Sequence, residues 1–193
     1  MLLSEEEAVH FAADTREEVI SRSPFRVRRV ARWSECDPAG VVYTGHFAEY
    51  MLSAVHLFRR YVFGGTWKEI REQVGVDTPN KAFSMVFNGS LWPDDVFDLR
   101  VQVGEIRSRT FDFEVTAIRA DDRSSVFTGK LSAICVKADD RRVATLIPDL
   151  LRRRLEDAKS AREEPAAGAK PTLGAGANQN SIETIAADAI KDA

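Results

Sequence analysis

One carboxylate in this sequence stands directly before a turn and the most hydrophobic helical segment of the chain. Asp37 lies within the run ECDPAGVVY, which covers residues 35–43. Pro38 disfavours the α conformation for Asp37 and Gly40 can adopt a positive φ, so we expect a turn here. A carboxylate held by such a turn can act as a general base or a nucleophile. From these residues alone, an Asp that caps the following helix is an equally good interpretation.

The spacing of apolar residues predicts a long helix after this turn. Between Tyr43 and Phe63 the bulky apolar side chains recur on one broad face, and the pair Gly64-Gly65 is typical of a helix end. The first backbone N–H groups of such a helix have no partner within it and lie at the positive end of its dipole. They can therefore polarise a carbonyl group close to Asp37.

Length and composition favour one main domain with an extension at each end. The chain has 193 residues, of which 44% are hydrophobic and 30% are charged, and its net charge of -3 argues against a general nucleic-acid binder. Its two cysteines, Cys36 and Cys135, give neither a disulfide framework nor a metal-ligand spacing. No stretch approaches the ~20 apolar residues that span a bilayer. We expect a soluble cytoplasmic protein without a bound metal.

The order of predicted elements indicates an α+β fold with an antiparallel sheet. Residues 1–24 are an expected extension with a weak helix to about Ile20, residues 25–155 are the main domain, and residues 156–193 are a low-complexity tail expected to be disordered. A capping box at Thr66 and Glu69 predicts a short helix from Trp67 to about Gln73. The expected strands are residues 25–33, 82–90, 96–105, 110–119 and 126–137.

The turn and the helix together resemble the signature of hot-dog-fold acyl-CoA thioesterases, most of all the 4-hydroxybenzoyl-CoA thioesterase type. The resemblance lies in the residues DPAGVV at 37–42, followed by an aromatic residue and the long helix. It extends over about residues 25–151 and includes the Trp67 segment, residues 92–95 and residues 107–109. It implies an antiparallel sheet wrapped around one long helix, in dimers or tetramers whose active sites lie between subunits.

The resemblance also implies roles for particular residues in the hydrolysis of an acyl-CoA thioester. Asp37 would be the nucleophile or the general base, and the backbone N–H of Thr44 would polarise the thioester carbonyl. Arg107 and Arg109 match residues that bind the nucleotide phosphates, although Ser108 stands where the family has a third basic residue. Arg141 is a further candidate for this role. Coenzyme A is part of the substrate, so no separate cofactor is expected.

The acyl group is expected to contact the start of the central helix. Tyr43, Phe47, Tyr50 and Met51 are candidates to line this pocket, although packing in the core explains residues of these types equally well. Leu52 stands where hydroxybenzoyl enzymes carry an acidic residue. The resemblance therefore favours a less polar aryl or medium aliphatic acyl group.

Two other functions remain open at the level of the sequence. The first is a hot-dog hydratase or dehydratase that acts on an acyl thioester and uses a histidine with an acid, for which His46 is the available histidine. The second is a non-catalytic scaffold that binds acyl thioesters. The sequence does not distinguish CoA from carrier-protein thioesters, or a dimer from a tetramer.

Overall fold

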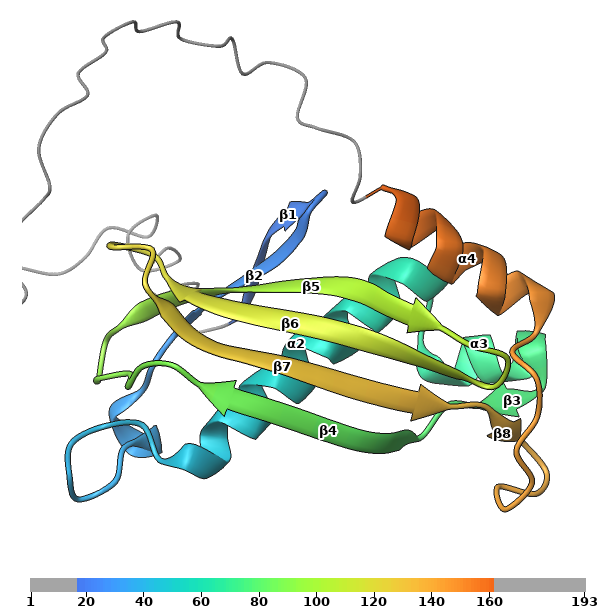
Figure 1. Ribbon diagram of the computed structural model, residues 1–193, viewed down its shortest axis with the longest axis horizontal. Coiled ribbons are helices and arrows are strands. Elements are labelled where there is room, and N and C mark those ends of the chain that lie inside the picture. Colours follow the sequence, from blue (N-terminus) through green and yellow to red (C-terminus); the bar gives the residue numbers. More distant parts are fainter. Residues whose placement is uncertain (1–16, 162–193) are drawn as a thin grey trace, which may run out of the picture.

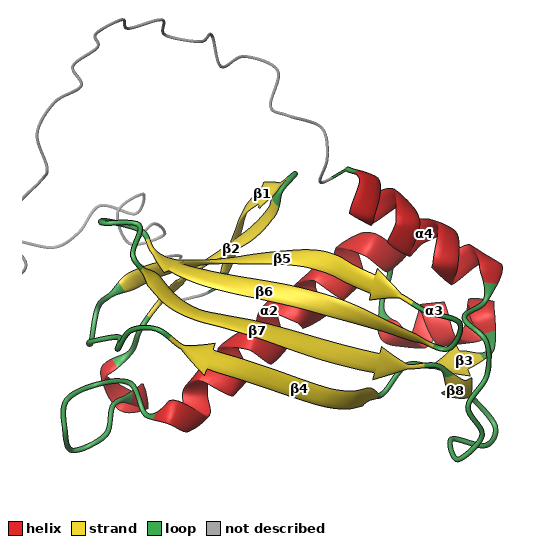
Figure 2. Cartoon of the chain, viewed as in Figure 1, coloured by secondary structure: helices red, strands yellow, loops and turns green. Residues whose placement is uncertain are grey.

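A single antiparallel sheet with a long helix against one face forms the framework of the protein (Figures 1 and 2). The structure is a computed structural model and describes residues 17–161. Its six-stranded sheet has the order β1-β2-β5-β6-β7-β4. The strands are β1 (Glu18–Arg22), β2 (Phe25–Val30), β4 (Asn80–Phe87), β5 (Val96–Ile106), β6 (Thr110–Arg119) and β7 (Ser125–Ile134). All neighbouring strands are antiparallel. The long helix lies in the connection from β2 to β4, which crosses the sheet to pair with β7.

The central helix α2 (Thr44–Phe63) buries one apolar stripe against the sheet. Its buried side chains are Phe47, Tyr50, Met51, Ala54, Val55, Phe58 and Phe63. Aromatic contacts join helix and sheet, with ring centroids 5.2 Å apart for Tyr50 and Phe97 and 5.7 Å apart for Phe58 and Phe113. The helix ends at Gly64, whose φ of 70° is a left-handed conformation that glycine adopts without strain.

Gly129 in β7 allows α2 to approach the sheet closely. A Cβ atom at this position would lie only 2.5 Å from Sδ of Met51, and Met51 is completely buried. Even alanine would therefore displace either the methionine or the helix. The missing side chain at Gly129 thus leaves room for the Met51 side chain between α2 and the sheet.

Several short elements gather around the C-terminal end of α2. They are α3 (Trp67–Val74), the two-stranded sheet of β3 (Val76–Asp77) and β8 (Val136–Lys137), and α4 (Asp149–Ser160), which packs against β5 and α2. Figure 1 shows the turn between β5 and β6 at this same end of the molecule. The loop that precedes α2, which contains Asp37, lies at the opposite end of the helix (Figure 1).

The structure confirms the expected fold class, an α+β hot-dog fold with one long central helix. The long helix begins at Thr44, and the capping box of Thr66 and Glu69 does start α3. Between Trp33 and Glu35 the expected strand gives way to a 3-10 turn, η1.

The expected extensions need correction at their inner ends. Residues 18–20 were expected to be weakly helical, but they belong to β1, because β1 pairs with β2 and completes one edge of the sheet. The main domain was expected to end at residue 155, although the sequence also predicts a helix to about Lys159; that helix is α4, which continues to Ser160, buries Leu155 and so extends the domain past the expected boundary. The remainder of both predicted extensions, residues 1–16 and 162–193, lies outside the described residues. No helix between residues 17 and 161 is long and apolar enough to cross a membrane.

Candidate active site

Asp37 occupies a tight turn that its own carboxylate helps to close. The backbone N–H of Gly40 donates to the carbonyl oxygen of Asp37 at 2.9 Å, and the N–H of Ala39 donates to Asp37 Oδ1 at 2.8 Å. Gly40 has a φ of 83°, which strains any other residue. No residue that the structure describes donates a hydrogen bond to Asp37 Oδ2, and the side chain is half-buried. One carboxylate oxygen is thus fixed by the turn and the other is available to a ligand.

The N-terminus of α2 carries no side-chain cap. Tyr43 is the N-cap residue and its side chain accepts no hydrogen bond from the helix. The interpretation of Asp37 as the cap of this helix is therefore wrong, because its carboxylate bonds within its own turn. Thr44, the first helical residue, is exposed. The N–H of His46 donates to the Tyr43 carbonyl oxygen at 2.9 Å, whereas the N–H of Thr44 has no acceptor among residues 17–161 and is open to an external carbonyl oxygen.

A buried carboxylate anchors the Asp37 turn to the central helix. Glu35 accepts hydrogen bonds from the hydroxyl of Tyr50 at 2.6 Å and from the N–H of Arg32 at 2.8 Å. The Arg29 guanidinium lies 4.3 Å from the centre of the Tyr50 ring and 3.4 Å from Glu35. Burial acts to raise the pKa of Glu35, but these donors outweigh it and lower the pKa. Glu35 is therefore a charged structural group.

Cys36 lies beside Asp37, but its surroundings oppose the formation of a thiolate. Desolvation, together with the negative charges of Glu35, Asp37 and Asp94, raises the pKa of the Cys36 thiol. A reactive cysteine needs the opposite environment, with nearby positive charge. Asp37 is therefore the candidate reactive group of this turn.

Three of the residues expected to contact the acyl group are buried in the core of the single chain. Phe47, Tyr50 and Met51 are at most 4% exposed, and the Tyr50 hydroxyl is committed to Glu35. The helical spacing that suggested these residues is also the spacing of a core stripe, and within one chain their surroundings are those of the core. Tyr43 is 58% exposed and Leu52 is 37% exposed, so these side chains can contact a ligand or another chain.

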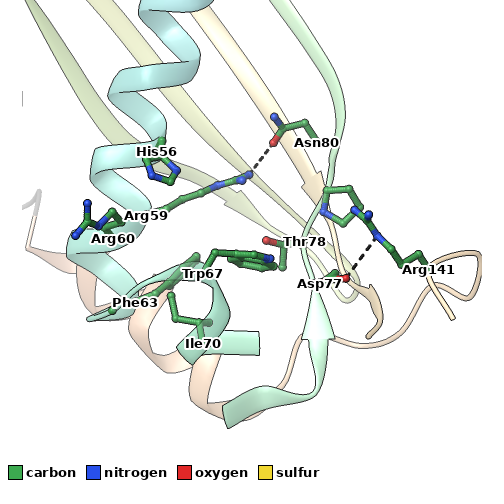
Figure 3. A pocket seen from close by; sticks show the side chains of 12 residues that line it. His56, Arg59, Arg60, Phe63, Trp67, Ile70, Asp77, Thr78, Asn80 and Arg141 are labelled. Atoms are coloured by element: carbon green, nitrogen blue, oxygen red, sulfur yellow. Dashed lines mark hydrogen bonds and ion pairs between the residues drawn. The ribbon is translucent and has the colours of Figure 1, made fainter. Parts of the chain in front are cut away.

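A pocket of about 370 Å³ lies at the other end of α2 (Figure 3). It is lined by His56, Arg59, Arg60, Phe63, Gly65, Trp67, Ile70, Asp77, Thr78, Pro79, Asn80 and Arg141. His56 follows Thr44 by 12 residues, which corresponds to about 18 Å along a helix. The pocket is therefore well separated from the Asp37 turn of the same chain.

The three arginines expected to bind phosphate differ in how they are engaged. Arg107 pairs with Glu105 and with both carboxylate oxygens of Asp112, the latter at 3.2 Å. Asp112 is completely buried and also contacts Lys130 at 2.7 Å. Arg107 is thus needed to neutralise Asp112, which places it in a structural network.

Arg109 and Arg141 are less constrained. Arg109 is exposed and forms no ion pair with any residue from 17 to 161, so it remains able to bind a phosphate group. Arg141 lies 3.5 Å from Asp77 and lines the pocket beside Thr78. The turn that holds Arg107 and Arg109 lies at the pocket end of the molecule, away from Asp37 (Figure 1).

Sequence reasoning found the Asp37 turn but missed the pocket. The most distinctive residue of the pocket is Arg59. It belongs to an Arg59-Arg60 pair near the end of α2, and arginine pairs on helices are usually solvated. The available signal was that Arg59 directly follows Phe58, an apolar residue on the predicted core stripe of the helix. Its neighbours in the pocket come from separate elements, so their proximity could not be read from spacing.

Comparison with known proteins places this fold and site in a family. Residues 31–155 match the family model of the thioesterase-like superfamily. The match covers more than half of the chain, so the protein belongs to the thioesterase-like superfamily. The family and the class of enzyme expected from the sequence are thereby confirmed. No curated protein matches the sequence.

Solved structures of low sequence identity share the fold. A 1,4-dihydroxy-2-naphthoyl-CoA thioesterase from Synechocystis is 16% identical with a TM-score of 0.62, over 69% of this chain and 96% of that one. The 4-hydroxybenzoyl-CoA thioesterase of Pseudomonas sp. strain CBS-3 is 19% identical with a TM-score of 0.61, over 67% and 96%. A hypothetical protein from Staphylococcus aureus in complex with CoA is 10% identical with a TM-score of 0.65, over 82% and 97%.

Proposed function

We propose that the protein hydrolyses an acyl-CoA thioester to a free acid and CoA. The observation that carries this proposal is the Asp37 carboxylate, with Oδ2 unengaged, in the loop that leads into the uncapped N-terminus of α2. Hydrolysis of a thioester requires a base or nucleophile and donors for the oxyanion that forms at the carbonyl. Asp37 supplies the first and the N–H of Thr44 the second. Superfamily membership and the acyl-CoA thioesterases among the structures of similar fold support the same reaction.

The hydratase alternative needs a histidine that works together with the acid. The available histidine, His46, places Nδ1 2.8 Å from Glu49 on its own helix. Because His46 pairs with Glu49 rather than with Asp37, this contact weighs against a hydratase mechanism. The scaffold alternative is decided by whether the protein turns over a thioester.

We further propose that two copies of the chain build each active site. The pocket and Arg109 lie at the end of α2 opposite to Asp37, so one chain cannot present them to the same small substrate. The strand β4 is an unpaired edge of the sheet, and Phe83, Val86 and Phe87 on it are 58%, 61% and 49% exposed. Such an apolar edge is suited to pairing with another copy.

Antiparallel pairing of β4 with its counterpart brings the two separated sites together. The strand begins at Asn80, which lines the pocket, and ends at Phe87, whose ring lies 5.4 Å from Phe47 near the start of α2. A twofold axis through β4 places the Asn80 end of one copy beside the Phe87 end of the other. The pocket of one chain then faces the Asp37 turn of its partner.

Release of CoA thiol from a panel of acyl-CoA and aryl-CoA esters tests the proposed activity. We expect hydrolysis by the wild type and a loss of about 10²-fold or more in Asp37→Asn, the scale of a positioned base or nucleophile. Asp157→Asn is the matched control, because Asp157 is exposed on α4 and does not line the pocket. Full activity in Asp37→Asn, or no hydrolysis of any ester by the folded wild type, would overturn the proposal. Light scattering tests the assembly, and a monomer that is fully active would overturn the shared site.

A further inference from the structure

Arg59 presents a guanidinium group to the pocket without a carboxylate partner. Its Nη2 donates to Asn80 Oδ1 at 2.8 Å, and its Cζ lies 5.2 Å from the centre of the Phe113 ring. Its Nε is shielded from solvent and has no hydrogen-bond partner. Among residues 17–161 no Asp or Glu forms an ion pair with Arg59. Arginines that are largely shielded from solvent are normally paired with a carboxylate or another anion. Arg59 therefore lacks an anionic partner that a ligand could supply.

Asp77 is the one acid among the described residues that line the pocket, and it is already engaged. Asp77 lies 3.3 Å from Arg71 and 3.5 Å from Arg141. These two arginines compensate its charge, and Arg60 adds a further positive charge at the rim. The pocket therefore has an excess of positive charge. Burial lowers the pKa of Arg59 to about 10, so the group remains charged at neutral pH at a cost that a bound anion would offset.

A second unsatisfied group lies in the same pocket. Thr78 is only 3% exposed, and its Oγ1 has no hydrogen-bond partner. Figure 3 shows the Thr78 hydroxyl on the side of the residue that faces Trp67, with Arg59 reaching across the cavity toward Asn80. The Thr78 hydroxyl has no partner and the Arg59 guanidinium has no carboxylate partner, so an anion with two oxygen atoms can serve both groups.

The walls of the pocket are apolar and enclose more than a single ion. Phe63 and Ile70 are at most 3% exposed and line the cavity together with Trp67. The volume of about 370 Å³ suits a small organic group. The pocket thus combines an apolar body with a positively charged end.

We propose that this pocket binds the distal carboxylate of the acyl group, and that the substrates are CoA thioesters of medium-length dicarboxylic acids. The carboxylate pairs with Arg59 and accepts a hydrogen bond from Thr78 Oγ1, while the carbon chain contacts the apolar walls. This inference rests on the proposed function, because the pocket meets the thioester only through the Asp37 turn of the partner copy. The inference narrows the expected medium-length aliphatic acyl groups to those that end in a carboxylate.

Matched pairs of esters test the inference in the full-length protein. Glutaryl-CoA and pentanoyl-CoA have equal chain lengths and differ in the terminal carboxylate, as do adipyl-CoA and hexanoyl-CoA. We expect the wild type to prefer the carboxylate ester of each pair by about tenfold or more in kcat/KM, since a charged hydrogen-bonded pair is worth at least that factor. Arg59→Gln should abolish this preference mainly through KM and leave the methyl-ended esters unaffected. Arg59→Lys should retain part of it.

The control variant is Arg153→Gln, since Arg153 is exposed on α4 and does not line the pocket. It should keep the wild-type preference. Hydrolysis of both esters of each pair at equal rates by the wild type would overturn the inference and leave the proposed function intact. A preference that survives Arg59→Gln would also overturn it. Because Arg59 has no charged partner, its replacement should not unfold the chain, and circular dichroism checks this.

Binding of the free dicarboxylate separates the inference from the proposed function. Isothermal titration of glutarate and adipate should show binding to the wild type and at least a tenfold weaker affinity for Arg59→Gln. If no thioester is hydrolysed but adipate still binds through Arg59, the proposed activity fails and the carboxylate pocket stands. If neither dicarboxylate binds the wild type, the pocket assignment fails. Binding of CoA alone should be equal in both proteins, and its loss in Arg59→Gln would assign the pocket to the nucleotide instead.

Discussion

Tyr50 donates its hydroxyl hydrogen to Glu35 at 2.6 Å, and this bond ties the central helix to the segment that carries Asp37. Tyr50 is fully buried, and the same Glu35 also accepts from the Arg32 backbone. Burial and the bond to Glu35 raise the pKa of Tyr50, so the phenol stays protonated and remains a donor. The position of the Asp37 turn therefore depends on a buried polar pair behind it.

Replacement of Tyr50 by phenylalanine tests this pair. The change removes one donor from the buried Glu35 carboxylate, so we expect the free energy of unfolding to fall by about 1–3 kcal/mol. Tyr61→Phe is the control, because Tyr61 is 47% exposed and its loss of a solvated hydroxyl should cost less than about 0.5 kcal/mol. Urea denaturation measures both. Equal effects of the two changes would show that the Glu35 bond adds no stability.

The buried carboxylates predict a loss of stability in acid. The pKa values of Glu35 and Asp112 are lowered by their donors despite burial, from ordinary values of 4.5 and 3.8. As the pH falls below these ordinary values, the unfolded chain takes up protons before the folded chain does, so the free energy of unfolding declines. It should be highest above about pH 5 and fall until the pH passes the folded pKa values. Asp112→Asn should be less stable at pH 7 and show a shallower decline, and urea denaturation between pH 3 and pH 7 compares the slopes. Parallel slopes in the two proteins would assign the acid sensitivity to other groups.

Arg107 and Arg109 should respond differently to the same substitution. Arg107→Gln leaves the buried Asp112 with fewer partners, and we expect a fall in the free energy of unfolding, limited by the remaining pair with Lys130. Arg109→Gln removes an exposed charge that the fold does not use, so stability should be unchanged and the KM for CoA esters should rise. Denaturation and steady-state kinetics on both variants test this. A larger rise in KM for a fully stable Arg107→Gln would reverse the assignment.

Alanine substitutions at two glycines with positive φ distinguish distortion of the Asp37 turn from backbone strain in general. Gly40 has a φ of 83° and Gly75 a φ of 67°, so alanine should cost about 1–2 kcal/mol at either position. Only Gly40 shapes the turn that holds Asp37. At a temperature where both variants are folded, Gly40→Ala should hydrolyse thioesters more slowly and Gly75→Ala should match the wild type. A full rate in Gly40→Ala would show that the turn tolerates distortion.

The features that follow from local chemistry were predictable from the sequence. Apolar spacing and Gly64 define α2, the Thr66 and Glu69 box defines α3, and alternation defines the central strands, including β6 with the expected bounds. The Asp37 turn also follows locally, from Pro38 and Gly40. Each of these depends on residues that are close together in the chain.

The features that depend on distant partners were not predictable. The strand β1 forms because β2 offers an edge to it, whereas its own sequence suggested a weak helix. In the sequence, Arg59 is indistinguishable from an ordinary solvated arginine on a helix. Only its contacts with Phe113 and Asn80 in the fold show that it lines a pocket. The distance between Asp37 and the pocket that contains Arg59 could be determined only from the structure, which gives the direction of α2 relative to β4 (Figure 1).

The close contact of Gly129 with Met51 lies between the two candidate functional regions of α2. Met51 is near the middle of the helix, and a methyl group at residue 129 would require either the Met51 side chain or the helix to shift. The N-terminal end of the helix holds the proposed oxyanion donor, and the C-terminal half holds Arg59. Where the helix shifts, both regions move, so a change at residue 129 would alter turnover and acyl selectivity together.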